Sequence, residues 1–267
     1  MSEPRVVVTV EDHVAHVRLH RPDKRNGLDL PMFEALVEAG EGLAADPRVR
    51  SVVLSGDGPA FCAGLDWMAF LAMGPDASAR LMARDPAGSP ANLAQRVCWI
   101  WAELPMPVVA AVHGVAFGGG LQLALGCDVR LVTRDAQLSV MEVRYGLIPD
   151  MSATQTLLRL VRPDVAKELM FTGRVFSGEE AVQLGLATRV VDDPVAAALA
   201  LARTIAGHSP HAVRAAKALA SRAPMLSPAE GLALEAELQL TLLGSPNQLE
   251  AVQATMTRRA PVFSDPG

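Results

Sequence analysis

The sequence predicts an α/β fold in which short buried strands alternate with helices in a wound core, followed by an all-helical C-terminal region. Two Val-rich runs, at 52–56 and 108–112, each end in a glycine turn that leads into a segment with helical spacing. The segments that follow, 60–66 and 116–122, share Ala-Phe at their start and Gly-Leu three residues later. This weak internal repeat indicates successive strand–turn–helix units of one kind.

The N-terminal half supports this fold element by element. Alternating β-branched residues over 5–10 and 14–20 predict a hairpin, and Asp29 is placed to cap a helix that begins at Pro31. Residues 74–90 are rich in Pro, Gly, Ala and Asp, so we expect a mobile loop or lid there. A helix over 92–103 should then lead into the strand before the central glycines.

The C-terminal half begins with short strands and ends in helices. We expect strands at 128–133 and 137–140, and helices at 152–160 and 165–171. Beyond Pro194 the pattern is helical, and Ser-Pro pairs at 209–210, 227–228 and 245–246 mark helix starts. We therefore divide the chain into a core, 1–195, and a helical region, 196–267, that packs against neighbouring subunits.

Composition narrows the function classes. A net charge of −5 argues against general nucleic-acid binding. The three cysteines have no paired spacing, the first residues lack the layout of a signal peptide, and no uncharged apolar run is long enough to span a membrane. His13, His16 and His20 have no further ligand at metal-binding spacing, so we expect no metal. These features together predict a cytoplasmic protein.

Three consecutive glycines, Gly118 to Gly120, open an apolar helical segment. Without Cβ atoms a ligand can approach the backbone, and unpaired N–H groups at a helix start favour negative charge. Close packing between helix and strand is the alternative explanation. The motifs of dinucleotide-binding folds, P-loops and α/β-hydrolases do not occur in the sequence.

Two acidic residues lie in apolar surroundings. Glu142 follows a short apolar run, and Asp150 comes eight residues later, across a Gly/Pro turn. Burial would raise either pKa and suit the group to proton transfer near neutral pH. The structural alternatives are an ion pair between Glu142 and Arg144 or Arg130, and an N-cap role for Asp150 on the helix at Ser152.

A set of motifs recurs in a fixed order along the chain, in the segments 60–66, 107–120, 127–130, 142–149, 168–173 and 180–187. By these segments the chain resembles, from about residue 5 to its C-terminus, the enoyl-CoA hydratase/isomerase (crotonase) superfamily. The resemblance implies a crotonase-like spiral of ββα units with a C-terminal helical trimerisation region. It also implies a homotrimer or hexamer (a dimer of trimers) that acts on an acyl-CoA thioester, with no cofactor other than the coenzyme A of the substrate.

The resemblance also assigns roles to residues. The backbone N–H groups of Leu65 and Gly119 would form an oxyanion hole for the thioester oxygen. Lys24 and Arg25 would bind the adenine and phosphate end of coenzyme A. The remaining substrate contacts would come from the glycine-rich segments, at Ala63, Gly64, Asp66 and Gly118.

The chain departs from the family pattern at one catalytic position. Glu142 matches the second of two hydratase glutamates, but Gln122 stands at the first, where it can orient water or substrate but cannot exchange a proton. Asp150 resembles an acid of the family's dienoyl-CoA isomerases, and Met151-Ser152 replaces a Gly-Gly pair and narrows the pocket.

We therefore expect an enzyme that moves protons on an unsaturated acyl-CoA, with Glu142 as principal acid/base, Asp150 as second and Gln122 positioning water or substrate. The mechanism favours double-bond isomerisation, while hydration remains the expected family activity. The alternatives are a dienoyl-CoA isomerase specifically, or a catalytically weak acyl-CoA-binding protein that kept the fold.

Overall fold

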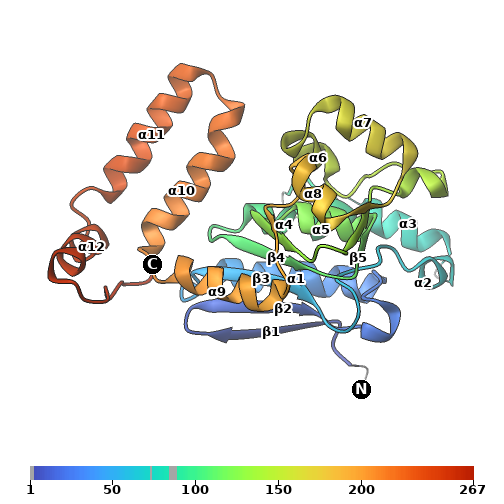
Figure 1. The fold of residues 1–267 in the computed structure, drawn as a ribbon, viewed down its shortest axis with the longest axis horizontal. Coiled ribbons are helices and arrows are strands. Elements are labelled where there is room, and N and C mark those ends of the chain that lie inside the picture. The colour runs from blue at the N-terminus through green and yellow to red at the C-terminus, as the bar shows by residue number, and fades with distance from the viewer. Residues whose placement is uncertain (1–2, 73, 84–88) are drawn as a thin grey trace.

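A mostly parallel six-stranded sheet forms the centre of the computed structural model, which describes residues 3–72, 74–83 and 89–267 (Figure 1). The strand order is β1-β2-β3-β4-β6-β9, and only β1 and β2 pair antiparallel, as the predicted hairpin. Their bounds are β1 (Val6–Glu11), β2 (Val14–Leu19), β3 (Ser51–Gly56), β4 (Val108–Val112), β6 (Val129–Val132) and β9 (Arg189–Val190).

A second, three-stranded sheet carries the glycine segment. It consists of β5 (Val115–Phe117), β7 (Gln137–Ser139) and β8 (Phe176–Ser177) in that order. The sequence does not predict β5, β8 or β9, because strands of two or three residues are too short to show a clear hydrophobic period.

Helices cover both faces of the central sheet. On one face, α1 (Leu30–Ala45), α4 (Leu93–Glu103) and α5 (Gly119–Leu125) pack against alternate strand residues such as Leu54 and Ala110. On the other, α9 (Pro194–Ala206) packs Ala198, Ala202 and Ala206 against Val53, Val109 and Leu131. The proposed division after residue 195 therefore falls inside a helix of the core, and as a division into domains it remains a prediction.

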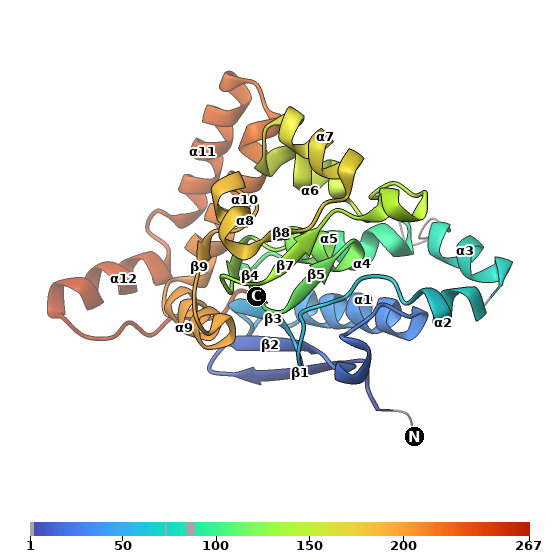
Figure 2. The ribbon, with the colours of Figure 1, turned by 45° about the vertical axis from the view of Figure 1, so that its right-hand side comes forward.

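The C-terminal helices α10 (Pro210–Arg222), α11 (Pro228–Leu242) and α12 (Pro246–Thr257) follow α9, and α11 and α12 project away from the sheets (Figures 1 and 2). Ser209, Ser227 and Ser245 each cap one of them by accepting a hydrogen bond from a backbone N–H of the first turn, which confirms the predicted starts. No helix in the described ranges is both long and apolar enough to cross a bilayer.

Two further predicted helices are confirmed, the first with its predicted cap. The Asp29 side chain accepts from the N–H of Met32 at 3.0 Å, and Asn92 forms a capping box with Gln95 at the start of α4. The other helices are α6 (Ala153–Leu160), α7 (Pro163–Thr172) and α8 (Gly178–Leu184). The 3-10 turns are η1 (Pro22–Lys24), which follows β2, η2 (Glu142–Tyr145), which follows β7, and η3 (Ala223–Met225), which follows α10.

The predicted loop over 74–90 is wrong for its first half. After α2 (Trp67–Ala72), residues Pro75–Met82 form the helix α3. Pro75 occupies a first-turn position, where its missing N–H costs nothing, so it starts a helix instead of breaking one. The part of the prediction at 84–88 lies outside the described residues.

Candidate active site

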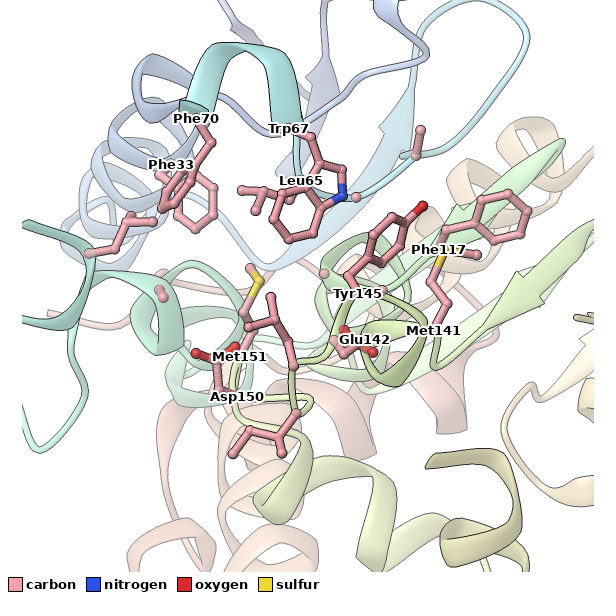
Figure 3. Close-up of a pocket in the computed structure, with 18 of the residues that line it drawn as sticks. Phe33, Leu65, Trp67, Phe70, Phe117, Met141, Glu142, Tyr145, Asp150 and Met151 are labelled. Carbon is pink, nitrogen blue, oxygen red and sulfur yellow. The ribbon is translucent and has the colours of Figure 1, made fainter. Parts of the chain in front are cut away.

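A cavity of about 310 Å³ is enclosed by residues of the helices α1, α2, α3 and α4, by the start of α5 and by the loop from Met141 to Met151 (Figure 3). Its walls are mostly apolar. Among the described lining residues the acidic side chains are Glu142 and Asp150, and none is a Lys, Arg or His. The lining residues are Phe33, Ala63, Gly64, Leu65, Trp67, Phe70, Leu81, Met82, Ala94, Phe117, Gly118, Gly119, Met141, Glu142, Tyr145, Leu147, Ile148, Asp150 and Met151.

The backbone N–H groups of Leu65 and Gly119, which line this cavity, have no acceptor within the part of the chain that the structure describes. The next N–H beyond Leu65 and the one before Gly119 are bonded, since Asp66 N donates to Leu28 O and Gly118 N donates to Ser139 O, both at 2.9 Å. Gly119 is the first residue of α5, where an N–H cannot bond within the helix. The site therefore holds two donors for a negatively charged oxygen.

Gly64 brings these two donors close together. Its φ is +83°, and a Cβ built on it would lie 2.4 Å from the backbone oxygen of Phe117 and 3.6 Å from Gly119 N. A side chain would thus push the Leu65 segment away from the start of α5. Only glycine fits this contact without moving one of the donors.

Glu142 begins η2 and is half-buried in the cavity wall. Gln122 Nε2 donates to Glu142 Oε1 at 2.6 Å, while Oε2 is buried without a partner among the described residues. Burial raises the pKa of Glu142, the nearby charge of Asp150 adds to this, and hydrogen bonds from its own backbone and from Gln122 oppose it. The result is a carboxyl group suited to exchange protons nearer neutrality than an exposed glutamate.

The alternative ion pairs of Glu142 are not found among the described residues. Arg130 donates from Nε to Leu186 O at 2.7 Å and from Nη1 to Cys127 O, so its guanidinium is used inside the core. Arg144 points to the exposed side of η2. Glu142 therefore has no cationic partner among the described residues.

Asp150 lies at the other end of the same loop, half-buried, and burial raises its pKa. Its predicted alternative as a helix N-cap is wrong: α6 starts at Ala153, with Ser152 at the capping position and no side-chain cap bond. In Figure 3 both carboxyl groups lie across the cavity from Trp67 and Phe70. Two acids with raised pKa values thus share one cavity.

Gln122 lies behind the cavity wall and is only 1% exposed. Besides donating to Glu142, it accepts a hydrogen bond at Oε1 from Met151 N at 2.9 Å. Both ends of the amide are therefore engaged by protein, and Gln122 is not among the residues that line the cavity. This placement differs from the predicted role of positioning water or substrate.

The remaining predicted contacts divide into two groups. Ala63, Gly64 and Gly118 line the cavity, but Asp66 does not. Asp66 Oδ2 pairs with Arg21 Nη1 at 2.7 Å and Oδ1 accepts from Ala69 N at 3.1 Å. Burial would raise the pKa of Asp66, but these bonds outweigh it and lower the pKa, as expected for a structural carboxylate at the start of α2.

Lys24 and Arg25 lie outside the cavity with exposed side chains. The carbonyl of Arg25 accepts from Ala63 N at 2.9 Å, so this basic turn is tied to the segment that carries Leu65. The two cationic residues therefore lie on a turn that is hydrogen-bonded to a cavity-lining segment. They form a local basic site in a chain whose net charge is negative.

Asn26, which was not among the predicted site residues, holds this turn in place. Asn26 is fully buried with a φ of +56°, and its Nδ2 donates to Asp57 O and Ala60 O at 2.9 and 2.8 Å. Its Oδ1 accepts from Arg21 N. The Asn26-Gly27 pair is a typical left-handed turn sequence, and that pattern could have identified the position.

Other candidate groups in the described ranges are structural. No cluster of three or more His, Cys, Asp or Glu residues there could hold a metal ion. The three cysteines are buried and unpaired, and burial raises the pKa of the Cys62 and Cys127 thiols to about 12, which makes them unreactive.

Comparison with known proteins agrees with this geometry. A family model described as enoyl-CoA hydratase/isomerase matches residues 9–266. The mitochondrial Delta(3,5)-Delta(2,4)-dienoyl-CoA isomerase of Mus musculus is 34% identical, over 95% of this chain and 79% of its own length. The (E)-benzylidenesuccinyl-CoA hydratase of Thauera aromatica is 33% identical, over 97% of this chain and 98% of its own. A crystal structure of an enoyl-CoA hydratase from Bacillus anthracis superposes with a TM-score of 0.89 at 31% identity, over 97% of this chain and 98% of that one.

Proposed function

The chain belongs to the enoyl-CoA hydratase/isomerase family, and from that premise we propose that it shifts a double bond in an unsaturated acyl-CoA, with Glu142 as the proton carrier. Membership confirms the predicted crotonase-type α/β fold and makes the protein an enzyme of a family that acts on coenzyme A thioesters. The observation that carries the proposal is the half-buried Glu142, on the wall of a cavity that also holds two unpaired N–H donors.

In the proposed reaction the Glu142 carboxylate removes a proton from C2, the carbon next to the thioester. The electron pair moves onto the thioester oxygen, which the N–H groups of Leu65 and Gly119 stabilise as an enolate. Each such donor contributes roughly 3 to 4 kcal/mol in comparable oxyanion holes. The electrons then return through the chain, the double bond moves toward the thioester, and a proton is added at C4, or at C6 of a conjugated diene.

Asp150 is the second acid/base in this proposal. In a dienoyl substrate the carbon that receives the proton lies several bonds from C2, beyond the reach of one carboxyl group. A second acid at the other end of the same loop, also with a raised pKa, suits that step. The similarity to a dienoyl-CoA isomerase supports this arrangement.

Hydration is the second candidate, since several relatives are named hydratases. Hydration needs a water molecule held by general base and acid groups at the double bond. Gln122 does not line the cavity and is bonded at both ends of its amide, so it cannot hold that water as placed. The geometry therefore favours a proton shift.

The cavity favours a neutral hydrocarbon acyl group. Its described walls offer aromatic and aliphatic side chains and two carboxyl groups, with no cation. A second carboxylate on the acyl chain would lose its hydration on entering the cavity. It would be repelled by the carboxylates of Glu142 and Asp150, and the described walls offer it no cation. We therefore expect dicarboxylic acyl-CoA thioesters to be poor substrates.

The rest of the coenzyme and the assembly are part of the same proposal. Lys24 and Arg25 would pair with coenzyme A phosphates, and the proton shift itself requires no further cofactor.

Exposed apolar side chains on the projecting helices, among them Leu240, Leu243, Leu249 and Met256, support a homotrimer or hexamer. The three buried, unpaired thiols support a reducing, cytoplasmic location.

A substrate panel tests the proposal. The protein is incubated with a 2-enoyl-CoA, a 3-enoyl-CoA, a 3,5-dienoyl-CoA and a dicarboxylic enoyl-CoA, and the products are analysed by mass spectrometry and NMR. We expect products of unchanged mass with shifted double bonds from the 3-enoyl and 3,5-dienoyl thioesters. Faster addition of water to the 2-enoyl thioester would establish hydration instead. Binding of coenzyme A without turnover of any thioester would identify an acyl-CoA-binding protein.

A further inference from the structure

Gln122 connects the two ends of the segment that carries both acids. This segment, residues 142–151, which we term the acid loop, begins with Glu142 and ends at Met151, next to Asp150. Gln122 Nε2 donates to Glu142 Oε1 at 2.6 Å, and Gln122 Oε1 accepts from Met151 N at 2.9 Å. One buried side chain on α5 thus bridges the first and last residues of the loop.

The chemistry of the bridge requires an amide. The N–H of Met151 can only donate, so the oxygen of Gln122 must face it and the amino group must face Glu142. A glutamate at position 122 could accept from Met151 but, when ionised, could not donate to Glu142. An apolar residue could do neither, and it would leave the buried backbone N–H of Met151 unpaired, which destabilises this arrangement of the loop.

The bridge also fixes the Glu142 carboxyl group. Oε1 accepts from Gln122 and would lie 3.2 Å from a Cβ built on Gly118, which lines the cavity. Oε2 is buried without a partner in the described ranges. The bond from Gln122 is therefore the side-chain contact that sets the orientation of this carboxyl group.

The same bridge sets the distance between the base and the oxyanion donors. The Met151 side chain packs on the start of α5, where a Cβ on Gly119 would lie 2.6 Å from Met151 Sδ. Gln122 belongs to that helix, three residues after Gly119. The first turn of α5 therefore carries both the Gly119 N–H and the anchor of the acid loop.

We propose that Gln122 is a positioning residue that acts through Glu142 and Met151: it fixes the acid loop to α5 so that the Glu142 carboxyl group faces C2, the carbon next to the thioester carbonyl whose oxygen the Leu65 and Gly119 amides hold. This inference rests on the proposed proton shift. It replaces a direct role for Gln122 on water with an indirect role on the base.

The test compares Gln122→Met and Gln122→Glu with wild type in the 3-enoyl-CoA isomerisation, measured as kcat and KM across pH. The Gln122 donor favours the charged form of Glu142, so its loss should raise the pKa of that carboxyl and move the acid limb of kcat/KM to higher pH. The Gln122→Glu variant should shift the limb further, because two carboxyls then share one site. We expect kcat to fall about 10- to 100-fold, with KM changed far less.

Two controls keep the outcome interpretable. Gln155→Met makes the same replacement at an exposed glutamine on α6 and should leave the pH profile unchanged. If Gln122→Met does not fold, Gln122→Asn, which keeps the amide but withdraws it from its partners, takes its place. Glu142→Gln is measured in parallel under the same conditions.

The results separate the two claims. If Glu142→Gln abolishes turnover while the Gln122 variants keep the wild-type kcat and acid limb, the positioning role is overturned and the proposed function stands. If the Gln122 variants lose activity only through KM, the positioning role is likewise overturned. If Glu142→Gln retains activity, or wild type does not isomerise the thioester, the proposed function fails and the inference fails with it.

Discussion

Cys62 and Ala116 face each other across an isolated parallel bridge that joins the two glycine-rich segments. Cys62 N donates to Val115 O at 3.0 Å, and Phe117 N donates to Cys62 O at 3.1 Å. Both residues are fully buried, so this short ladder is protected from water. Three residues beyond each partner, Leu65 and Gly119 present their unpaired amides to the same cavity.

The bridge makes Gly64 a sensitive position. Gly64→Ala should lower kcat about 10²- to 10³-fold, since the new Cβ would lie 2.4 Å from the Phe117 oxygen and displace the Leu65 donor. Steady-state isomerisation kinetics and a thermal melt measure the two consequences. Gly42→Ala is the matched control: it lies in α1 with no atom within 4 Å of the new Cβ, and it should be neutral or stabilising by up to about 1 kcal/mol. Wild-type kcat in Gly64→Ala would contradict the two-donor site.

Stability should respond to pH through Glu142. Because burial raises the pKa of Glu142, the native state favours the protonated form, and stability falls as pH rises through that raised pKa. Gln is neutral at every pH, so Glu142→Gln should melt above wild type at pH 8 and close to it at pH 4. Each kcal/mol should move Tm by about 2 to 4 °C.

Differential scanning calorimetry at both pH values measures this effect. Glu38→Gln, an exposed change on α1, should show no difference from wild type at either pH. A Glu142→Gln variant that melts below wild type at pH 8 would show that the carboxylate is stabilised by the fold, contrary to its surroundings here.

The acyl chain should extend toward Phe33 and Phe70, which lie away from Glu142 (Figure 3). Ala94, 3% exposed on α4, lines the same cavity, so Ala94→Leu should shorten it. We expect a lower kcat/KM for long-chain than for short-chain 3-enoyl-CoA thioesters, and a stability cost within about 1 to 3 kcal/mol for overpacking. Ala44→Leu, exposed on α1, is the control. An unchanged chain-length preference would place the acyl group elsewhere.

Features carried by local chemistry could be predicted from the sequence. The caps at Asp29 and Ser227, the hairpin and the strands β3 and β4 follow from residue type and period over a few residues. The internal repeat indicated two similar units, and the structure pairs them directly. Apolar surroundings also indicated the raised pKa of Glu142 before its burial was known.

Features that depend on long-range placement could not be predicted. Gln122 and Glu142 are twenty residues apart, and only the packing of α5 against η2 shows that the Gln122 amide faces Glu142 rather than the cavity. Helix α3 could not be predicted because Gly74 and Pro75 are residue types that occur both in turns and at the starts of helices. The aromatic wall at Trp67 and Tyr145, with ring centroids 4.9 Å apart, joins α2 to η2 across almost eighty residues of sequence.

The most direct test of the central claim is the rate at which label leaves C2 of a 3-enoyl-CoA carrying deuterium there, followed by NMR with wild type, Glu142→Gln and Glu38→Gln. Label is lost from C2 whether it passes to solvent or along the chain, so the measurement reports proton abstraction itself. We predict loss that is about 10²- to 10⁴-fold slower in Glu142→Gln and unchanged in Glu38→Gln. Equal rates in wild type and Glu142→Gln would show that another group removes the proton and would contradict the account.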